Sequence, residues 1–231
     1  MTGPLYLVGG DEWNDGCAFD ATLLADSGGD EVVVLPTASA YEAPTALIER
    51  ATSWFAGLGG RVRALPVYGR TDALDDDHVA AVRAARAIYL SSGSPMHLRS
   101  VLKDTPLLDA IVGAWRDGAV LAGSAAGAVV WFDHMVDARG GAYTVGVGQL
   151  SGFTVIPRFD TWSLDKVRRT VDLAAPGLVV AGVPDRTALV HRPDAGWTVE
   201  GVGEVRVFRD GGPAALSDLP DLASLGHPRG G

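Results

Sequence analysis

The feature that most constrains the fold is a repeated alternation of short apolar runs with helix-like segments. Such runs suit buried parallel strands, because helices cover both faces of a parallel sheet and leave no polar face. Five of them precede residue 123, most of them ended by Gly or Pro, at residues 5–8, 32–35, 62–67, 87–90 and 119–122.

The segments between these runs have the marks of helices. Residues 43–58 carry apolar side chains three and four positions apart. Three acids, Asp75 to Asp77, open another segment, where negative charge favours a helix N-terminus. Pro106 directly follows Thr105 and suits the first helical position. The alternation predicts a three-layer α/β/α sandwich around a mostly parallel, doubly wound sheet.

The texture changes after about residue 140. Residues 140–152 are rich in Gly and predict a hairpin or loop, and residues 163–173 predict a helix. Further strands are expected at residues 153–156, 178–180, 188–190, 197–199 and 204–208. We expect the last four of these to form an antiparallel edge of the same sheet. No long linker or repeat interrupts the chain, so we predict one domain over residues 1–210 and a flexible tail over residues 211–231.

Composition excludes several classes of function. The net charge is −9 with no Lys/Arg cluster, which disfavours a nucleic-acid partner. No apolar run approaches the ~18 residues of a membrane span, and no signal sequence is evident, so a cytoplasmic protein is expected. The single cysteine, Cys17, excludes an internal disulfide and a cysteine-rich zinc site, and we predict that it is buried. No metal-ligand spacing or nucleotide-binding motif occurs, so neither a metal nor a cofactor is expected. Exposed edge strands would permit a homodimer without requiring one.

The fifth apolar run leads into a distinctive turn. Residues 123–127 read G-S-A-A-G, the frame of a G-x-S-x-G nucleophile elbow between a strand and a helix. Ala125 occupies the position of the nucleophile, and a methyl group cannot attack a carbonyl. Ser124 lies one residue early. It is either a small residue that lets the turn close or a substitute nucleophile.

Ligands of open α/β sheets bind beyond the carboxyl ends of the strands. Four loops would meet there, at residues 9–12, 90–95, 123–127 and 155–160. We expect the first of them to form a turn at the rim of the crevice. His97 follows the second and is the histidine that could act there as a base. The remaining histidines are expected to be exposed or capped: His78, His134, His191 and His227.

Four motifs in this order resemble peptidase family S51, which contains dipeptidase E and cyanophycinase. They are S-S-G-S-P at 91–95, G-S-A-A-G-A at 123–128, V-I-P-R-F-D at 155–160 and G-V-P-D-R-T-A-L at 182–189. The resemblance extends over about residues 5–208. It implies a class I glutamine amidotransferase-like fold. It also implies a serine-type peptidase or hydrolase that acts on small peptides with acidic or isopeptide-linked residues.

The resemblance also assigns roles, and the chain departs from the family at two of them. The family's general-base histidine corresponds to Arg158, its acid to Asp185 and its nucleophile to Ala125. We call these three residues the triad positions. A serine hydrolase needs its base to take the proton from the serine, so loss of both groups predicts an impaired mechanism.

The oxyanion donors implied by the resemblance are the backbone N–H groups of Gly93 and Ala126, with Ser94 beside them. Two hypotheses follow. In the first, the chain is an impaired homologue that binds a small acidic peptide or another anion. Arg158 is then either a bidentate partner of that anion or a member of a surface salt bridge with Asp160 or Asp185. In the alternative, the chain is an active hydrolase that uses Ser124 or His97.

Overall fold

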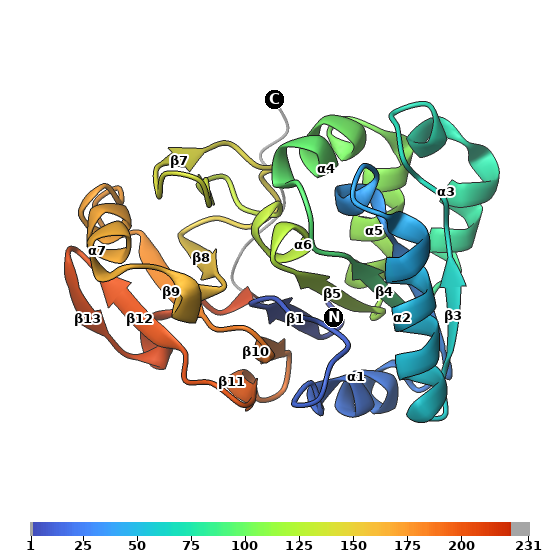
Figure 1. Ribbon diagram of the computed structural model, residues 1–231, viewed down its shortest axis with the longest axis horizontal. Helices are drawn as coiled ribbons and strands as arrows, with labels where there is room; N and C mark the ends of the chain where they lie inside the picture. The colour runs from blue at the N-terminus through green and yellow to red at the C-terminus, as the bar shows by residue number, and fades with distance from the viewer. Residues whose placement is uncertain (1, 223–231) are drawn as a thin grey trace.

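The central element of the computed structural model, which describes residues 2–222, is a seven-stranded sheet (Figure 1). Its strand order is β11-β10-β1-β5-β4-β2-β3. Five strands are parallel: β1 Leu5–Val8, β2 Glu31–Leu35, β3 Arg61–Ala64, β4 Ala87–Leu90 and β5 Val120–Ser124. The antiparallel edge consists of β10 Thr187–Arg192 and β11 Gly196–Gly201. The predicted fold class, a mostly parallel sheet with an antiparallel C-terminal edge, is confirmed.

Both faces of this sheet are covered. Successive strand residues point to opposite faces, so Leu7 joins one apolar core and Val8 the other. The core around Val8 packs against α1 Phe19–Ser27 and α2 Pro44–Gly57. The core around Leu7 packs against α3 Asp76–Arg83, α4 Pro95–Leu102, α5 Pro106–Arg116 and the short α6 Ala126–Val129. In Figure 1, α1 lies below the strands of the main sheet, and α4 and α6 lie above them. Cys17 is completely buried, as predicted.

Side-chain caps fix where the predicted helices begin. Asp75 is the N-cap of α3, and its Oδ1 accepts hydrogen bonds from the backbone N–H groups of Asp77 and His78. Thr105 caps α5 in the same way, directly before Pro106. The sequence signals for both helix starts were therefore sound.

A second, four-stranded sheet lies beside the first, at the left of Figure 1. Its order is β13-β12-β9-β8, from Gly212–Ala214, Arg206–Arg209, Val179–Val183 and Phe153–Pro157. The prediction that residues 178–180 and 204–208 extend the main sheet was wrong, because β9 pairs with β8 and β12 instead. Alternating apolar residues identify a strand but not its partner.

The remaining elements are short. Only β7 of the observed hairpin lies in the Gly-rich region, since its partner β6 precedes residue 140, and the helix expected nearby is α7. Their bounds are β6 Met135–Val136, β7 Tyr143–Thr144 and α7 Leu164–Asp172, and the 3₁₀ turns are η1 Thr37–Ser39, η2 Asp72–Leu74, η3 Phe159–Thr161 and η4 Leu216–Asp218. One apolar core joins the two sheets, since it contains residues of both β1 and β9. Within residues 2–222, no helix has the length and apolar composition to cross a membrane.

The C-terminal segment packs against the main sheet. The predicted flexible tail begins too early, because residues 212–214 pair in β13 and Leu219 and Leu222 are buried. The indole Nε1 of Trp197 donates to the carbonyl of Pro220 over 2.8 Å, which fixes the segment to β11. The rest of the predicted tail, residues 223–231, lies outside the described residues.

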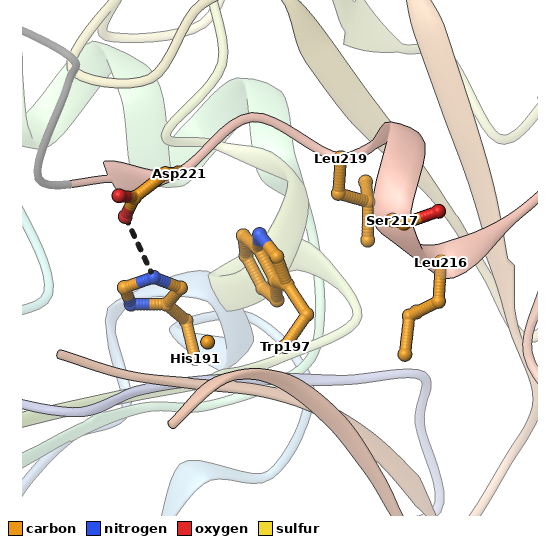
Figure 2. Close-up of a pocket in the computed structure, with 7 residues that line it drawn as sticks. His191, Trp197, Leu216, Ser217, Leu219 and Asp221 are labelled. Carbon is orange, nitrogen blue, oxygen red and sulfur yellow. Dashed lines mark ion pairs between the residues drawn. The ribbon is translucent and has the colours of Figure 1, made fainter. Parts of the chain in front are cut away.

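His191 lies below this segment, in a cavity of about 320 Å³ (Figure 2). It was expected to be exposed or capped, yet it is 1% exposed because the C-terminal segment covers it. Its ring packs edge-on against Trp197, with centroids 5.0 Å apart, and its Nε2 lies 3.4 Å from Asp221 Oδ1. Burial lowers the pKa of His191, and the Asp221 carboxylate opposes that shift.

Candidate active site

The elbow has the backbone conformation that a nucleophile normally occupies. Ala125 lies between β5 and α6 with φ 44° and ψ −97°, a region that side-chain-bearing residues rarely adopt. Its N–H donates to the carbonyl of Val8 over 2.9 Å. Strain of this kind costs on the order of 1–3 kcal/mol and is held in place by surrounding structure. The chain therefore maintains a strained turn around a methyl group.

Two glycines let this turn close. A Cβ on Gly127 would lie 2.2 Å from the carbonyl oxygen of Leu90, and one on Gly123 would lie 2.1 Å from that of Gly127. Both distances are far below van der Waals contact. Because a backbone oxygen occupies each place, the elbow requires glycine at both positions for reasons of space.

The structure brings Arg158 and Asp185 together. Arg158 Nε lies 3.3 Å from Asp185 Oδ1 and donates to Oδ2 over 3.4 Å. The arginine side chain is 58% exposed, whereas that of Asp185 is 13% exposed. An ion pair with one solvated partner contributes little to folding stability, about 0–1 kcal/mol. The pair therefore contributes charge to the site more than it contributes stability to the fold.

A further acid, Asp160, interacts with Asp185 of this pair. Burial raises the pKa of Asp185, the positive charge of Arg158 opposes that shift, and the negative charge of Asp160 adds to it. Asp160 Oδ1 also accepts a hydrogen bond of 2.9 Å from the backbone N–H of Asp185. Asp160 thus orients the acid position through the main chain, a role that its sequence position alone did not indicate.

The end of β1 connects the triad positions. The Val8 carbonyl accepts from Ala125, and the next carbonyl, that of Gly9, accepts from the N–H of Arg158 over 3.0 Å. Gly10 follows, and a Cβ there would lie 2.3 Å from Asp185 Oδ1. The predicted convergence of these loops is thus visible in their hydrogen bonds.

The two implied oxyanion donors have no hydrogen-bond acceptor among the described residues. Within residues 2–222, neither the N–H of Gly93 nor that of Ala126 donates to a protein acceptor. Gly93 has φ 134°, and a Cβ on it would lie 2.3 Å from the carbonyl oxygen of Ala38. Ser94 behaves differently, because its N–H donates to Ala38 and its Oγ accepts from the N–H of His97 as the N-cap of α4. A binding role for Ser94 stays a prediction.

The two alternative catalytic residues are engaged elsewhere. Ser124 is completely buried, and its hydroxyl donates to Glu12 Oε2 over 2.8 Å. The Nε2 of His97 lies 2.8 Å from the carbonyl oxygen of Tyr68, and the ring meets Tyr41 edge-on. Either residue would have to break these contacts before it could act on a substrate.

Glu12 is the residue that sequence reasoning missed. The loop at residues 9–12 was expected at the rim, yet Glu12 is only 2% exposed. Its Oε1 accepts from both the N–H and the Oγ of Ser92, over 3.0 and 2.6 Å. The available signal was an acid directly after one strand with serines directly after two others, since such groups meet at the same sheet edge.

A cavity of about 460 Å³ adjoins the site. Two tryptophans, Trp13 and Trp54, contribute to its wall together with Asp11 and Arg186, whose Nε lies 3.4 Å from Asp11 Oδ2. Within the described part of the chain, no cluster of three or more His, Cys, Asp or Glu side chains is arranged to hold a metal ion.

Comparison with known proteins agrees with this geometry. Residues 9–192 match the model of peptidase family S51. A cyanophycinase of Geminocystis herdmanii is 32% identical over 112 residues, covering 48% of this chain and 41% of that protein. A cyanophycinase of Nostoc sp. is 25% identical over 217 residues, covering 89% of this chain and 73% of that protein.

Two solved structures have the same fold. The crystal structure of a peptidase from an acI-B1 Actinobacterium is 30% identical, with a TM-score of 0.80 over 90% of this chain and 91% of that one. A putative peptidase E protein from Listeria monocytogenes is 18% identical, with a TM-score of 0.69 over 88% of this chain and 100% of that one. The class I glutamine amidotransferase-like fold is thereby confirmed. Because the family model matches residues 9–192 and a solved peptidase is 30% identical over 90% of this chain, the protein belongs to peptidase family S51.

Proposed function

We propose that this family member is impaired in the Ser-His-acid mechanism and binds a small acidic peptide or another small anion at the triad positions. The observation that carries the proposal is Ala125, which holds a strained elbow conformation without an attacking atom. Strain persists only where neighbouring structure imposes it. The groups around the elbow, Arg158 and the N–H groups of Gly93 and Ala126, can donate hydrogen bonds to an anion.

The chemical argument concerns two missing steps. Acyl transfer requires an oxygen or sulfur nucleophile, and a base that takes its proton. Ala125 offers neither atom, and the guanidinium of Arg158 does not accept a proton at neutral pH. Loss of the nucleophile alone typically lowers turnover by about 10⁶-fold. We therefore expect hydrolysis by the standard route to be absent.

The same substitutions favour an anion. The Arg158 side chain is 58% exposed, and within residues 2–222 its Nε is the nitrogen that donates to Asp185. Its terminal nitrogens can donate two parallel hydrogen bonds to a carboxylate. The N–H groups of Gly93 and Ala126 offer further donors. The names of the curated relatives and of the solved structures favour a peptide over an inorganic ion as the source of that carboxylate.

The alternative, an active serine-type hydrolase, has less support. It requires Ser124 to leave a fully buried hydrogen bond with Glu12, or His97 to leave Tyr68. Wild-type hydrolysis of acidic dipeptides that Ser124→Ala abolishes would favour this alternative over our proposal.

Binding is tested by calorimetric titration with acidic dipeptides, free Asp and Glu, and phosphate. Charge-assisted hydrogen bonds contribute about 1.5–3 kcal/mol, so Arg158→Gln should weaken binding by about 10- to 150-fold. Arg168→Gln is the matched control, because that arginine is 83% exposed and pairs only with Asp172 within the described residues. Equal affinities for wild type and Arg158→Gln, or no binding of any probe to wild type, would refute the proposal.

The frame itself is tested by restoring the missing groups. The double variant Ala125→Ser with Arg158→His supplies a nucleophile and a base beside the existing Asp185. If the elbow and its donors are intact, this variant should hydrolyse acidic dipeptides, while each single variant should not. Activity in neither the double nor the single variants would indicate that more than two groups have been lost.

A further inference from the structure

One buried carboxylate joins three loops of the site. Glu12 follows β1, Ser92 follows β4 and Ser124 ends β5. Glu12 Oε1 accepts from the N–H and Oγ of Ser92 over 3.0 and 2.6 Å, and its Oε2 accepts from Ser124 Oγ over 2.8 Å. Both carboxylate oxygens thus accept hydrogen bonds, and Glu12 as a whole is 2% exposed.

The partners of Glu12 lie next to the candidate oxyanion donors. Ser92 directly precedes Gly93, and Ser124 precedes Ala126 by two residues. The N–H groups of Gly93 and Ala126 belong to different loops, and the parallel pairing of β4 and β5 ends at Leu90 and Gly123. Beyond that pairing, the Glu12 carboxylate is a direct side-chain link between the two loops.

We propose that Glu12 is a positioning residue, which holds the Gly93 and Ala126 amides at the separation needed to bind one ligand oxygen. Donors of this kind act only when their geometry is fixed before the ligand arrives. This inference rests on the function proposed above. It also gives the Ser124 hydroxyl a structural use, since that hydroxyl fastens the strained turn to Glu12.

The length and the charge of the Glu12 side chain can be tested separately by substitution. Glu12→Asp keeps the negative charge but shortens the side chain by one methylene, so that it cannot span from Ser92 to Ser124. Glu12→Gln keeps the length, because its amide oxygen can accept from Ser92 while its NH₂ donates to the Ser124 hydroxyl. A positioning role predicts that Gln preserves the site better than Asp, whereas a role for the charge predicts the reverse order.

The ligand-free protein provides the first measurement. The Gly93 and Ala126 amide resonances and hydrogen-exchange rates should change in Glu12→Asp and stay close to wild type in Glu12→Gln. Glu49→Asp, at an exposed glutamate on α2, is the matched control for the loss of one methylene. If the Gly93 and Ala126 amides of Glu12→Asp keep the wild-type resonances and exchange rates, the proposal is overturned, whatever the protein binds.

The second measurement is the affinity for an acidic dipeptide. We expect Glu12→Asp to weaken binding at least ~10-fold and Glu12→Gln to weaken it less than ~3-fold, with Glu49→Asp unchanged. If wild type binds no dipeptide, the proposed function fails and the amide measurement still decides the role of Glu12. If Glu12→Asp does not fold, Ser124→Ala removes the hydrogen bond to Oε2, and Ser92→Ala removes the hydroxyl bond to Oε1 while the Ser92 N–H bond remains. Ser92→Ala should then shift the Gly93 amide and Ser124→Ala the Ala126 amide, and unshifted amides in both variants would overturn the proposal.

Discussion

The buried carboxyl group of Asp20 leads to a specific prediction about the pH dependence of folding. Asp20 lies on α1 and is 0% exposed, and its Oδ2 accepts from Trp54 Nε1 over 2.9 Å. Its Oδ1 has no hydrogen-bond partner within the described residues. Burial, reinforced by the negative charge of Glu12, raises the pKa of Asp20 from 3.8 to about 8.

The sign follows from proton linkage. Between about pH 4 and pH 8 the folded chain holds a proton on Asp20 that the unfolded chain has released. Folding stability from this group therefore decreases as the pH rises through that interval. One pKa unit corresponds to 1.36 kcal/mol, so the loss between pH 5 and pH 8 is about 3 to 4 kcal/mol. Against a total stability of about 5–15 kcal/mol, that loss is readily measured.

Asp20→Asn removes this titration and keeps an oxygen that can accept from Trp54. Unfolding in urea at pH 5, 6, 7 and 8 gives the free energy of unfolding of both proteins. The variant should gain about 3 to 4 kcal/mol relative to wild type between pH 5 and pH 8, because only wild type pays the cost of ionising a buried group. Other titrating groups are common to both proteins and cancel in the difference.

Asp194→Asn, in the exposed turn between β10 and β11, is the control. Its difference from wild type should stay within about 0.5 kcal/mol at every pH. A pH-independent difference for Asp20→Asn would refute the assignment of a raised pKa. A difference that grows toward acid would refute the sign.

Two further predictions concern the elbow and the C-terminal segment. Gly127→Ala should destabilise the fold by about 1–3 kcal/mol in urea unfolding, since the new Cβ would meet the Leu90 carbonyl. Gly113→Ala, which has open space in α5, should stabilise the fold by about 0.5–1 kcal/mol. Equal effects of the two substitutions would contradict the crowding at the elbow. The ring of His191 should titrate below pH 6.5 by NMR, and Asp221→Asn should lower that midpoint further because it removes the charge that favours the imidazolium; a midpoint raised by Asp221→Asn would contradict the contact.

The parts of the fold that the sequence predicted are those encoded by neighbouring residues. The N-cap residues Asp75 and Thr105 predict where their helices begin, because each accepts a hydrogen bond from an N–H within three residues. The apolar runs that end in Gly or Pro predict the strands of the main sheet. The triad positions were located through the elbow frame and the motif order, and the structure brings Arg158 and Asp185 into contact.

The parts that escaped prediction depend on residues far apart in the chain. The pairing of β9 with β8 and β12 is a choice among similar strands, which periodicity does not make. Glu12 is buried because donors 80 and 112 residues away satisfy its oxygens. His191 is covered by a segment that composition alone marked as a tail. Burial of polar groups is decided by tertiary partners, and a single sequence lists no partners.

The division of the chain into two sheets determines how the site can change. Ala125 follows β5 of the main sheet, whereas Arg158 follows β8 and Asp185 lies where the chain passes from β9 to β10. The attacking position therefore follows a strand of the main sheet, whereas the two charged positions follow strands of the four-stranded sheet. On the function proposed above, substitutions in the loops that follow β8 and β9 should alter which ligand charge is accepted, and these loops are separate from the turn around Ala125. Engineering of ligand preference should accordingly begin with residues 157–160 and 183–186, with the elbow left as it is.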